Sequence, residues 1–193
     1  MPSIDAFVAA NQDRFIAELE EFLRIPSVST YPEQRSEMVR AARFVASQLE
    51  SAGLENVELV PTARHPLVYG EWLHAAGKPT VLCYGHYDVQ PVEPLDLWEH
   101  PPFDPVVRDG NIYARGASDD KGQMMTHIKA VEALKAANGG LPVNVKFLIE
   151  GEEEIGGTPF QKYIVGYREK LKADVALVSD TNLWDETTPA LCL

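Results

Sequence analysis

Helical and strand patterns alternate along the whole of this 193-residue chain, and its longest strand patterns are largely apolar. Apolar residues dominate Thr80–Tyr84 and Val143–Ile149. Strands of this kind suit a sheet that is covered on both faces. Helices that alternate with such strands predict a three-layer α/β/α domain, in which ligands bind at the carboxyl ends of the strands.

The expected elements follow from periodicity and from the glycines and prolines between them. Helices are expected over residues 4–23, 38–49, 124–134 and 159–170, and strands over 57–60, 67–72, 80–84, 112–113, 143–149 and 174–178. The proline-rich stretch Asp88–Asp109 predicts one long ordered loop. The final apolar run Ala190–Leu193 is interpreted as an interrupted strand.

Composition limits the classes of partner. The chain has 17 Lys and Arg against 29 Asp and Glu, a net charge of −12, which argues against nucleic acid and anionic membranes. Cys83 and Cys192 are too few and too far apart for a disulfide framework, so a reducing cytoplasm is expected. The first 13 residues lack a signal-peptide pattern, and no stretch is long and apolar enough to span a bilayer.

Four polar clusters lie between Thr80 and Asp180, and three of them directly follow apolar strand patterns. The clusters are Gly85–Asp88, Ala117–Gly122, Gly151–Glu154 and Ser179–Asp180. A fold that gathers strand ends would bring one imidazole and several carboxylates together. So much negative charge requires a cation. The ligand types indicate zinc or a similar divalent ion.

His86 and Asp88 are separated by one residue, so both side chains point to the same side of an extended segment. His86 could bind zinc through one ring nitrogen while Asp88 accepts the N–H of the other. Alternatively, His86 caps a backbone carbonyl and Asp88 begins a turn. Asp119 and Asp120 precede a helix; one could cap it while the other bridges two metals.

Three consecutive acidic residues, Glu152, Glu153 and Glu154, follow the strand at Val143–Ile149. Of two adjacent carboxylates, one could bind a metal ion and the other could act as a general base. The alternative is a solvated acidic surface. Asp180 repeats the pattern after the last strand and is a plausible terminal metal ligand.

These motifs resemble the M20 metallopeptidases, a family of aminoacylases, carboxypeptidases and carnosinase-like dipeptidases. The run Tyr84–Pro91 resembles the family's first metal motif. Segments between Trp98 and Gly122 resemble its second block, especially in the dipeptidase branch, and Gly151–Gly156 resembles the catalytic-base block. The resemblance extends from the first helix to the last residue.

The resemblance implies roles for six residues, together with two zinc ions per complete site, for which manganese or cobalt could substitute. His86 and Asp180 would bind one zinc, Glu154 the second and Asp119 both, while Asp88 would orient His86 and Glu153 would be the general base. Glu153 and Glu154 are chosen over Glu152 because Gly156 then falls where the family has its glycine. The family often has a cis peptide bond after the bridging aspartate, here Asp119–Asp120.

The function implied is hydrolysis of dipeptides or short peptides through a metal-bridged water activated by Glu153. The alternatives are an N-acyl amino acid deacylase or desuccinylase with the same metal centre, or an inactive fragment that only self-associates. Residues 1–193 would form the N-terminal segment of the catalytic domain, incomplete at its C-terminus. The family's last histidine ligand is absent, as is the lid domain that forms the homodimer and binds the substrate carboxylate. The isolated chain is therefore expected to be inactive and to self-associate.

Overall fold

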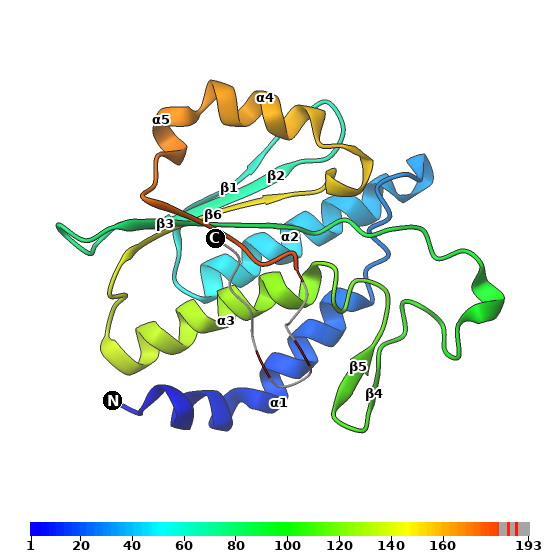
Figure 1. The fold of residues 1–193 in the computed structure, drawn as a ribbon, viewed down its shortest axis with the longest axis horizontal. Coiled ribbons are helices and arrows are strands. Elements are labelled where there is room, and N and C mark those ends of the chain that lie inside the picture. Colours follow the sequence, from blue (N-terminus) through cyan, green and yellow to red (C-terminus); the bar gives the residue numbers. More distant parts are fainter. Residues whose placement is uncertain (182–184, 186–187, 189–193) are drawn as a thin grey trace.

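The computed structural model describes residues 1–181, Asp185 and Thr188, so the strand predicted at Ala190–Leu193 lies outside the described residues. A five-stranded sheet forms the middle layer, with helices on both faces (Figure 1). The predicted three-layer α/β/α class is confirmed.

The sheet is mixed, with strand order β1-β2-β6-β3-β7. β3 (Thr80–His86), β6 (Asn144–Glu150) and β7 (Val175–Val178) run parallel. β1 (Glu55–Val60) and β2 (Leu67–Trp72) form an antiparallel pair, and β2 also pairs antiparallel with β6. Because β3, β6 and β7 are parallel, their carboxyl ends meet at one edge of the sheet.

Three long helices cover one face of the sheet and two shorter ones cover the other (Figure 1). The first face carries α1 (Ile4–Leu23), α2 (Arg35–Ser51) and α3 (Lys121–Asn138). The second carries α4 (Thr158–Gly166) and α5 (Arg168–Leu171). The prediction of one continuous helix over 159–170 is wrong.

The helix ends follow local sequence signals. The Ser3 side chain caps α1 by accepting a hydrogen bond from the Ala6 N–H. Gly139 ends α3 in the left-handed conformation, with φ of 73°. The break between α4 and α5 falls at Tyr167, directly after Gly166, a residue with poor helix propensity.

Strand β6 supplies apolar side chains to both faces, as its sequence predicts. Val145, Phe147 and Ile149 belong to the core cluster under α1, α2 and α3, whereas Leu148 belongs to the cluster that includes Tyr163 of α4. Lys146 also lies on the strand, but its Nζ donates to the carbonyl oxygens of residues 170 and 172. The charged side chain is thus accommodated without interrupting the core.

The stretch Asp88–Asp109 is not one unbroken loop, which corrects the prediction. It contains a short 3₁₀ turn at Leu95–Leu97 and ends in β4 (Val106–Arg108), which pairs with β5 (Asn111–Tyr113). Asp109 and Gly110 link the strands, with φ of 53° and 79°. An Asp-Gly pair with positive φ at both positions favours a two-residue hairpin turn.

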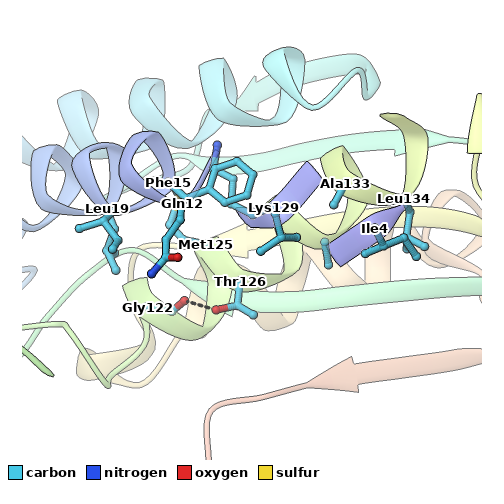
Figure 2. Close-up of a pocket in the computed structure, with 13 residues that line it drawn as sticks. Ile4, Gln12, Phe15, Leu19, Gly122, Met125, Thr126, Lys129, Ala133 and Leu134 are labelled. Atoms are coloured by element: carbon cyan, nitrogen blue, oxygen red, sulfur yellow. Dashed lines mark hydrogen bonds between the residues drawn. The ribbon is translucent and has the colours of Figure 1, made fainter. Parts of the chain in front are cut away.

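An apolar hollow of about 810 Å³ lies between α1 and α3 and is lined by side chains of both helices. Figure 2 shows the lining of this hollow, with Leu19 and Phe15 of α1 and Met125 of α3 toward one end and Ile4 of α1 beside Leu134 of α3 toward the other. Within the described part of the chain, no helix is long and apolar enough to cross a membrane.

Candidate metal centre

Three side chains of ligand type meet at the edge where the parallel strands end. His86 is the last residue of β3, Asp119 lies just before α3, and Asp180 follows β7. One potential ligand atom from each lies within 4.8 Å of the others. The Nε2 atom of His86 is 3.1 Å from Oδ1 of Asp119 and 3.7 Å from Oδ2 of Asp180. The topology thus brings together residues that are up to 94 positions apart, the span from His86 to Asp180.

The His86 ring is fully buried and held from one side. Its Nδ1 is 3.0 Å from the carbonyl oxygen of Asp88 and 3.3 Å from the carboxylate Oδ1 of the same residue. Nε2 has no hydrogen-bond partner among the described residues, because its short contact to Asp119 lacks hydrogen-bond geometry. With the proton on Nδ1, the free lone pair on Nε2 points toward the two other ligand candidates.

Asp88 connects His86 to the acidic turn, Glu153–Ile155, and is itself fully buried. Its Oδ2 accepts hydrogen bonds from Oγ of Ser29 at 2.7 Å and from the backbone N–H of Glu154 at 3.1 Å. Its Oδ1 accepts from the backbone N–H of Glu153 at 3.3 Å. One carboxylate therefore fixes both the imidazole and the turn that carries the two glutamates.

The three consecutive glutamates occupy different environments. Glu152 is only 3% exposed, and its Oε1 accepts from the His65 N–H at 3.1 Å and the Thr62 hydroxyl at 3.3 Å. Glu153 is exposed, and the Glu154 carboxylate accepts a hydrogen bond from the Gln90 side chain. The contacts of Glu152 thus lead away from the metal group, toward Thr62 and His65.

Asp119 and Asp120 are joined by a cis peptide bond, as the family resemblance implies, but their side chains diverge. Asp119 is exposed at the metal group, whereas Asp120 is buried. Asp120 occupies the N-cap position of α3 but makes no side-chain capping bond; its Oδ2 instead accepts from the His86 N–H at 3.1 Å. The interpretation that one aspartate caps the helix through its side chain is therefore wrong for Asp120.

Two residues near the centre were not predicted from the sequence. Glu150, the last residue of β6, pairs with His86 across the strands and is 2% exposed. It accepts a hydrogen bond from the Tyr84 hydroxyl at 2.9 Å. The signal for Glu150 in the sequence was its position as a glutamate at the end of a buried strand. Ser29, which donates to Asp88, lies 59 residues from it, so local sequence gave no signal for this contact.

Burial, and after it the charges of neighbouring carboxylates, raises the pKa of the carboxylates around His86. Burial raises the pKa of Asp120, Glu150 and Glu154 to about 7, and it also raises the pKa of Glu153. Burial lowers the pKa of His86, but the hydrogen bond to Asp88 and nearby carboxylates outweigh it, so the pKa rises to about 10. Such a site holds more negative charge than its own protein groups balance. An imidazole nitrogen without a partner beside two carboxylates fits a divalent metal ion.

Comparison with known proteins gives consistent matches. The profile of Peptidase family M20/M25/M40 matches residues 82–192. Beta-Ala-His dipeptidase of Rattus norvegicus is 34% identical over 202 residues, covering 96% of this chain and 40% of that protein. Cys-Gly metallodipeptidase dug1 of Schizosaccharomyces pombe is 35% identical over 193 residues, covering 93% of this chain and 40% of that protein.

A solved structure is also similar. The crystal structure of human carnosine dipeptidase 1 superposes with a TM-score of 0.86 at 33% identity, covering 94% of this chain and 41% of that one. The chain thus spans about 40% of the length of the curated relatives it matches.

Proposed function

The chain belongs to Peptidase family M20/M25/M40, and we propose that it carries most of the metal site of a zinc-dependent dipeptidase. The observation that supports this most directly is the group of His86, Asp119 and Asp180, whose ligand atoms lie within 4.8 Å of one another. His86 adds a buried nitrogen without a hydrogen-bond partner in the described structure. Dipeptides are favoured over N-acyl amino acids because relatives that match more than nine-tenths of the chain are named dipeptidases.

His86 and Asp180 would hold one metal ion, Glu154 a second, and Asp119 both. When bound, zinc supplies Lewis-acid chemistry to the scissile carbonyl and to water. Asp88 keeps the His86 proton on Nδ1 and so leaves Nε2 free as a ligand.

Glu153 would act as the general base. Its backbone N–H is held by Asp88, while its carboxylate is exposed on the same turn as Glu154. Although the residue is exposed, partial desolvation raises the pKa of Glu153 toward neutral pH, where a base both accepts and returns a proton efficiently. Glu153 would take a proton from the attacking water and deliver it to the leaving amine.

Calorimetric titration of zinc into the metal-free chain tests the metal assignment. We expect one strong site, whose affinity falls by at least about 100-fold in His86→Ala because a buried ligand is lost. His74→Ala is the matched control, since His74 is exposed and contacts Glu55 away from the centre. Equal zinc affinity in His86→Ala and the wild-type chain would contradict the proposal.

Hydrolysis is tested on a longer protein that contains this chain and has the full length of the relatives. Release of free amino acids from a dipeptide should require zinc and should disappear in Asp119→Ala. The 193-residue chain alone should show no turnover, because Asp119 and Glu154 are the only ligands proposed here for the second ion. Zinc-independent hydrolysis by the longer protein would rule out the proposed chemistry.

A further inference from the structure

A histidine of α3 is joined by a hydrogen bond to the segment that carries the proposed ligand Asp180. Ser179 lies between the end of β7 and Asp180, and His127 lies in the second turn of α3. Nε2 of His127 is 2.6 Å from Oγ of Ser179, although 52 positions separate the two residues in the sequence. Both residues are half-buried. The pair therefore links a helix directly to the residue next to a proposed metal ligand.

Asp180 depends on contacts of this kind because it lies beyond the strand pairing. The parallel pairing of β3 with β7 ends with Tyr84 opposite Val178, two residues before Asp180. Among the described strands, β7 has only β3 as a neighbour. By contrast, His86 still lies within the pairing, opposite Glu150 of β6. The carboxylate of Asp180, 3.7 Å from Nε2 of His86, thus needs support from outside the sheet to keep its position.

Helix α3 is connected to each of the three proposed ligands. Asp119 lies just before the helix, and Oδ2 of Asp120, at the N-cap, accepts a hydrogen bond from the backbone N–H of His86 at 3.1 Å. His127 follows Asp120 by seven positions, so the two lie on the same face of the helix, two turns apart. One rigid element therefore supports His86 and Asp119 through its start, and the segment of Asp180 through His127.

We propose that His127 is a positioning residue, whose hydrogen bond to Ser179 fixes where the carboxylate of Asp180 meets the metal ion. This inference rests on the proposed metal site and adds to it a residue outside the ligand set. A hydroxyl group both donates and accepts, so the bond requires one ring nitrogen and no charge on the ring. Groups that orient metal ligands typically change metal affinity by about 10- to 100-fold when they are lost. We expect the lower end of this range, because His127 acts on the neighbour of the ligand.

The test combines calorimetric titration of zinc into the metal-free 193-residue chain with the visible absorption of the cobalt-loaded chain, which reports the geometry of the ligands. His127→Leu should lower zinc affinity by about tenfold and should change the cobalt spectrum. His127→Gln should restore most of the affinity and the spectrum, because its amide group can donate or accept at a similar reach. A purely structural contact would change the urea midpoint of the metal-free chain but neither of these two signals.

A double-mutant cycle shows whether the two side chains act as one unit. Ser179→Ala should lower zinc affinity about as much as His127→Leu, and the double variant should bind no more weakly than either single variant, because all three lack the same bond. Thr126→Ala is the matched control, since Thr126 precedes His127 on α3 but donates to the carbonyl oxygen of Gly122 within the helix. The control should bind zinc with the affinity of the wild-type chain.

Unchanged zinc affinity and cobalt spectrum in His127→Leu would overturn the proposal. Losses of affinity that add in the double variant, or a His127→Gln variant no better than His127→Leu, would overturn it as well. Failure of the metal site itself has a different result, equal zinc affinity in the wild-type chain and in His86→Ala, and that result would overturn both proposals.

Discussion

Asp88 shows how much of the candidate centre depends on one buried side chain. Its carboxylate accepts three hydrogen bonds, from Ser29, Glu153 and Glu154, and also lies 3.3 Å from Nδ1 of His86. A residue expected only to orient the imidazole thus also holds the turn proposed to carry the base and a metal ligand. Ligand position and base position are therefore coupled through a single group.

The distinct environments of the consecutive glutamates predict different effects of substitution. Glu153→Gln in the longer, active protein should retain zinc but lower turnover by about 10²- to 10⁴-fold, because only the base is removed. Glu152→Gln should mainly lower stability, because this buried side chain accepts from His65 and Thr62. Steady-state kinetics and thermal unfolding separate the two effects. A well-folded Glu152→Gln with the larger loss of turnover would transfer the base assignment to Glu152.

Zinc affinity should rise with pH, because protons compete with the metal. Burial raises the pKa of Glu154 to about 7. For His86, burial lowers the pKa, but Asp88 and other carboxylates outweigh it and raise the value to about 10. Both groups bind metal only after losing their protons, so affinity increases as pH rises through 7 and onward toward 10. Calorimetry in paired buffers on the longer protein, in which Glu154 would bind the second ion, should show more protons released per zinc at about pH 6 than at about pH 8. Equal affinity and equal proton release at the two pH values would contradict this linkage.

At the residue scale, the sequence predicted the types and positions of the chemical groups better than their partners. His86, Asp119 and Asp180 could be identified because each follows a strand or precedes a helix. The contact of Glu152 with His65 could not, because 87 residues separate them and only the packed loops bring them together. Pairings of this kind depend on tertiary structure, which local patterns do not encode.

The joint between α1 and α3 depends on Lys121, which is fully buried at the first position of α3. Its Nζ donates to the carbonyl oxygens of Phe22 at 3.1 Å and Ile25 at 2.7 Å, and lies 4.7 Å from the Phe22 ring centre. Burial lowers the pKa of Lys121 to about 7. Both carbonyl groups also accept a backbone N–H, Phe22 from Ile25 at 3.1 Å and Ile25 from Ser27 at 2.9 Å, so the lysine adds a second, charged donor where α1 ends.

Lys121→Met should destabilise the fold by about 2–3 kcal/mol, because it removes two buried hydrogen bonds donated by a charged group. Urea unfolding followed by circular dichroism measures the change. Lys162→Met is the control, since Lys162 is exposed on α4 and its loss should change stability by less than about 0.5 kcal/mol. Similar unfolding midpoints for the two variants would show that the contacts of Lys121 contribute little.

Elements with a strong periodic pattern were predicted closely, and those that depend on a short signal were not. The helix expected over 4–23 and the strand expected over 67–72 have those bounds in the structure. The β4–β5 hairpin was only partly predicted, because Asp109–Gly110 is a two-residue signal between three-residue strands. The break after Gly166 was missed because apolar periodicity continues across it.

Within the described part of the chain, the apolar surface includes two places suited to association. Val175 and Val178 of β7 are 54% and 52% exposed, and β7 pairs only with β3 among the described strands. The second place is the hollow between α1 and α3 (Figure 2). An edge strand and an apolar patch both promote association.

We therefore predict that the 193-residue chain self-associates in a concentration-dependent manner. Light scattering should show species larger than a monomer at micromolar concentration. Val178→Lys should shift association to about tenfold higher concentration, because a charge on an edge strand opposes pairing. Lys162→Glu, an exposed change on α4, is the control. A wild-type chain that stays monomeric throughout the concentration range would contradict the prediction.

Anomalous diffraction from zinc-soaked crystals tests most directly whether His86, Asp119 and Asp180 form a metal site. We expect a zinc peak between Nε2 of His86 and the carboxylates of Asp119 and Asp180, at ligand distances of about 2.0–2.2 Å. A His86→Ala crystal treated in the same way should lack this peak. Ordered zinc elsewhere in the wild-type crystal, with no peak among these three side chains, would show that they do not form the metal site.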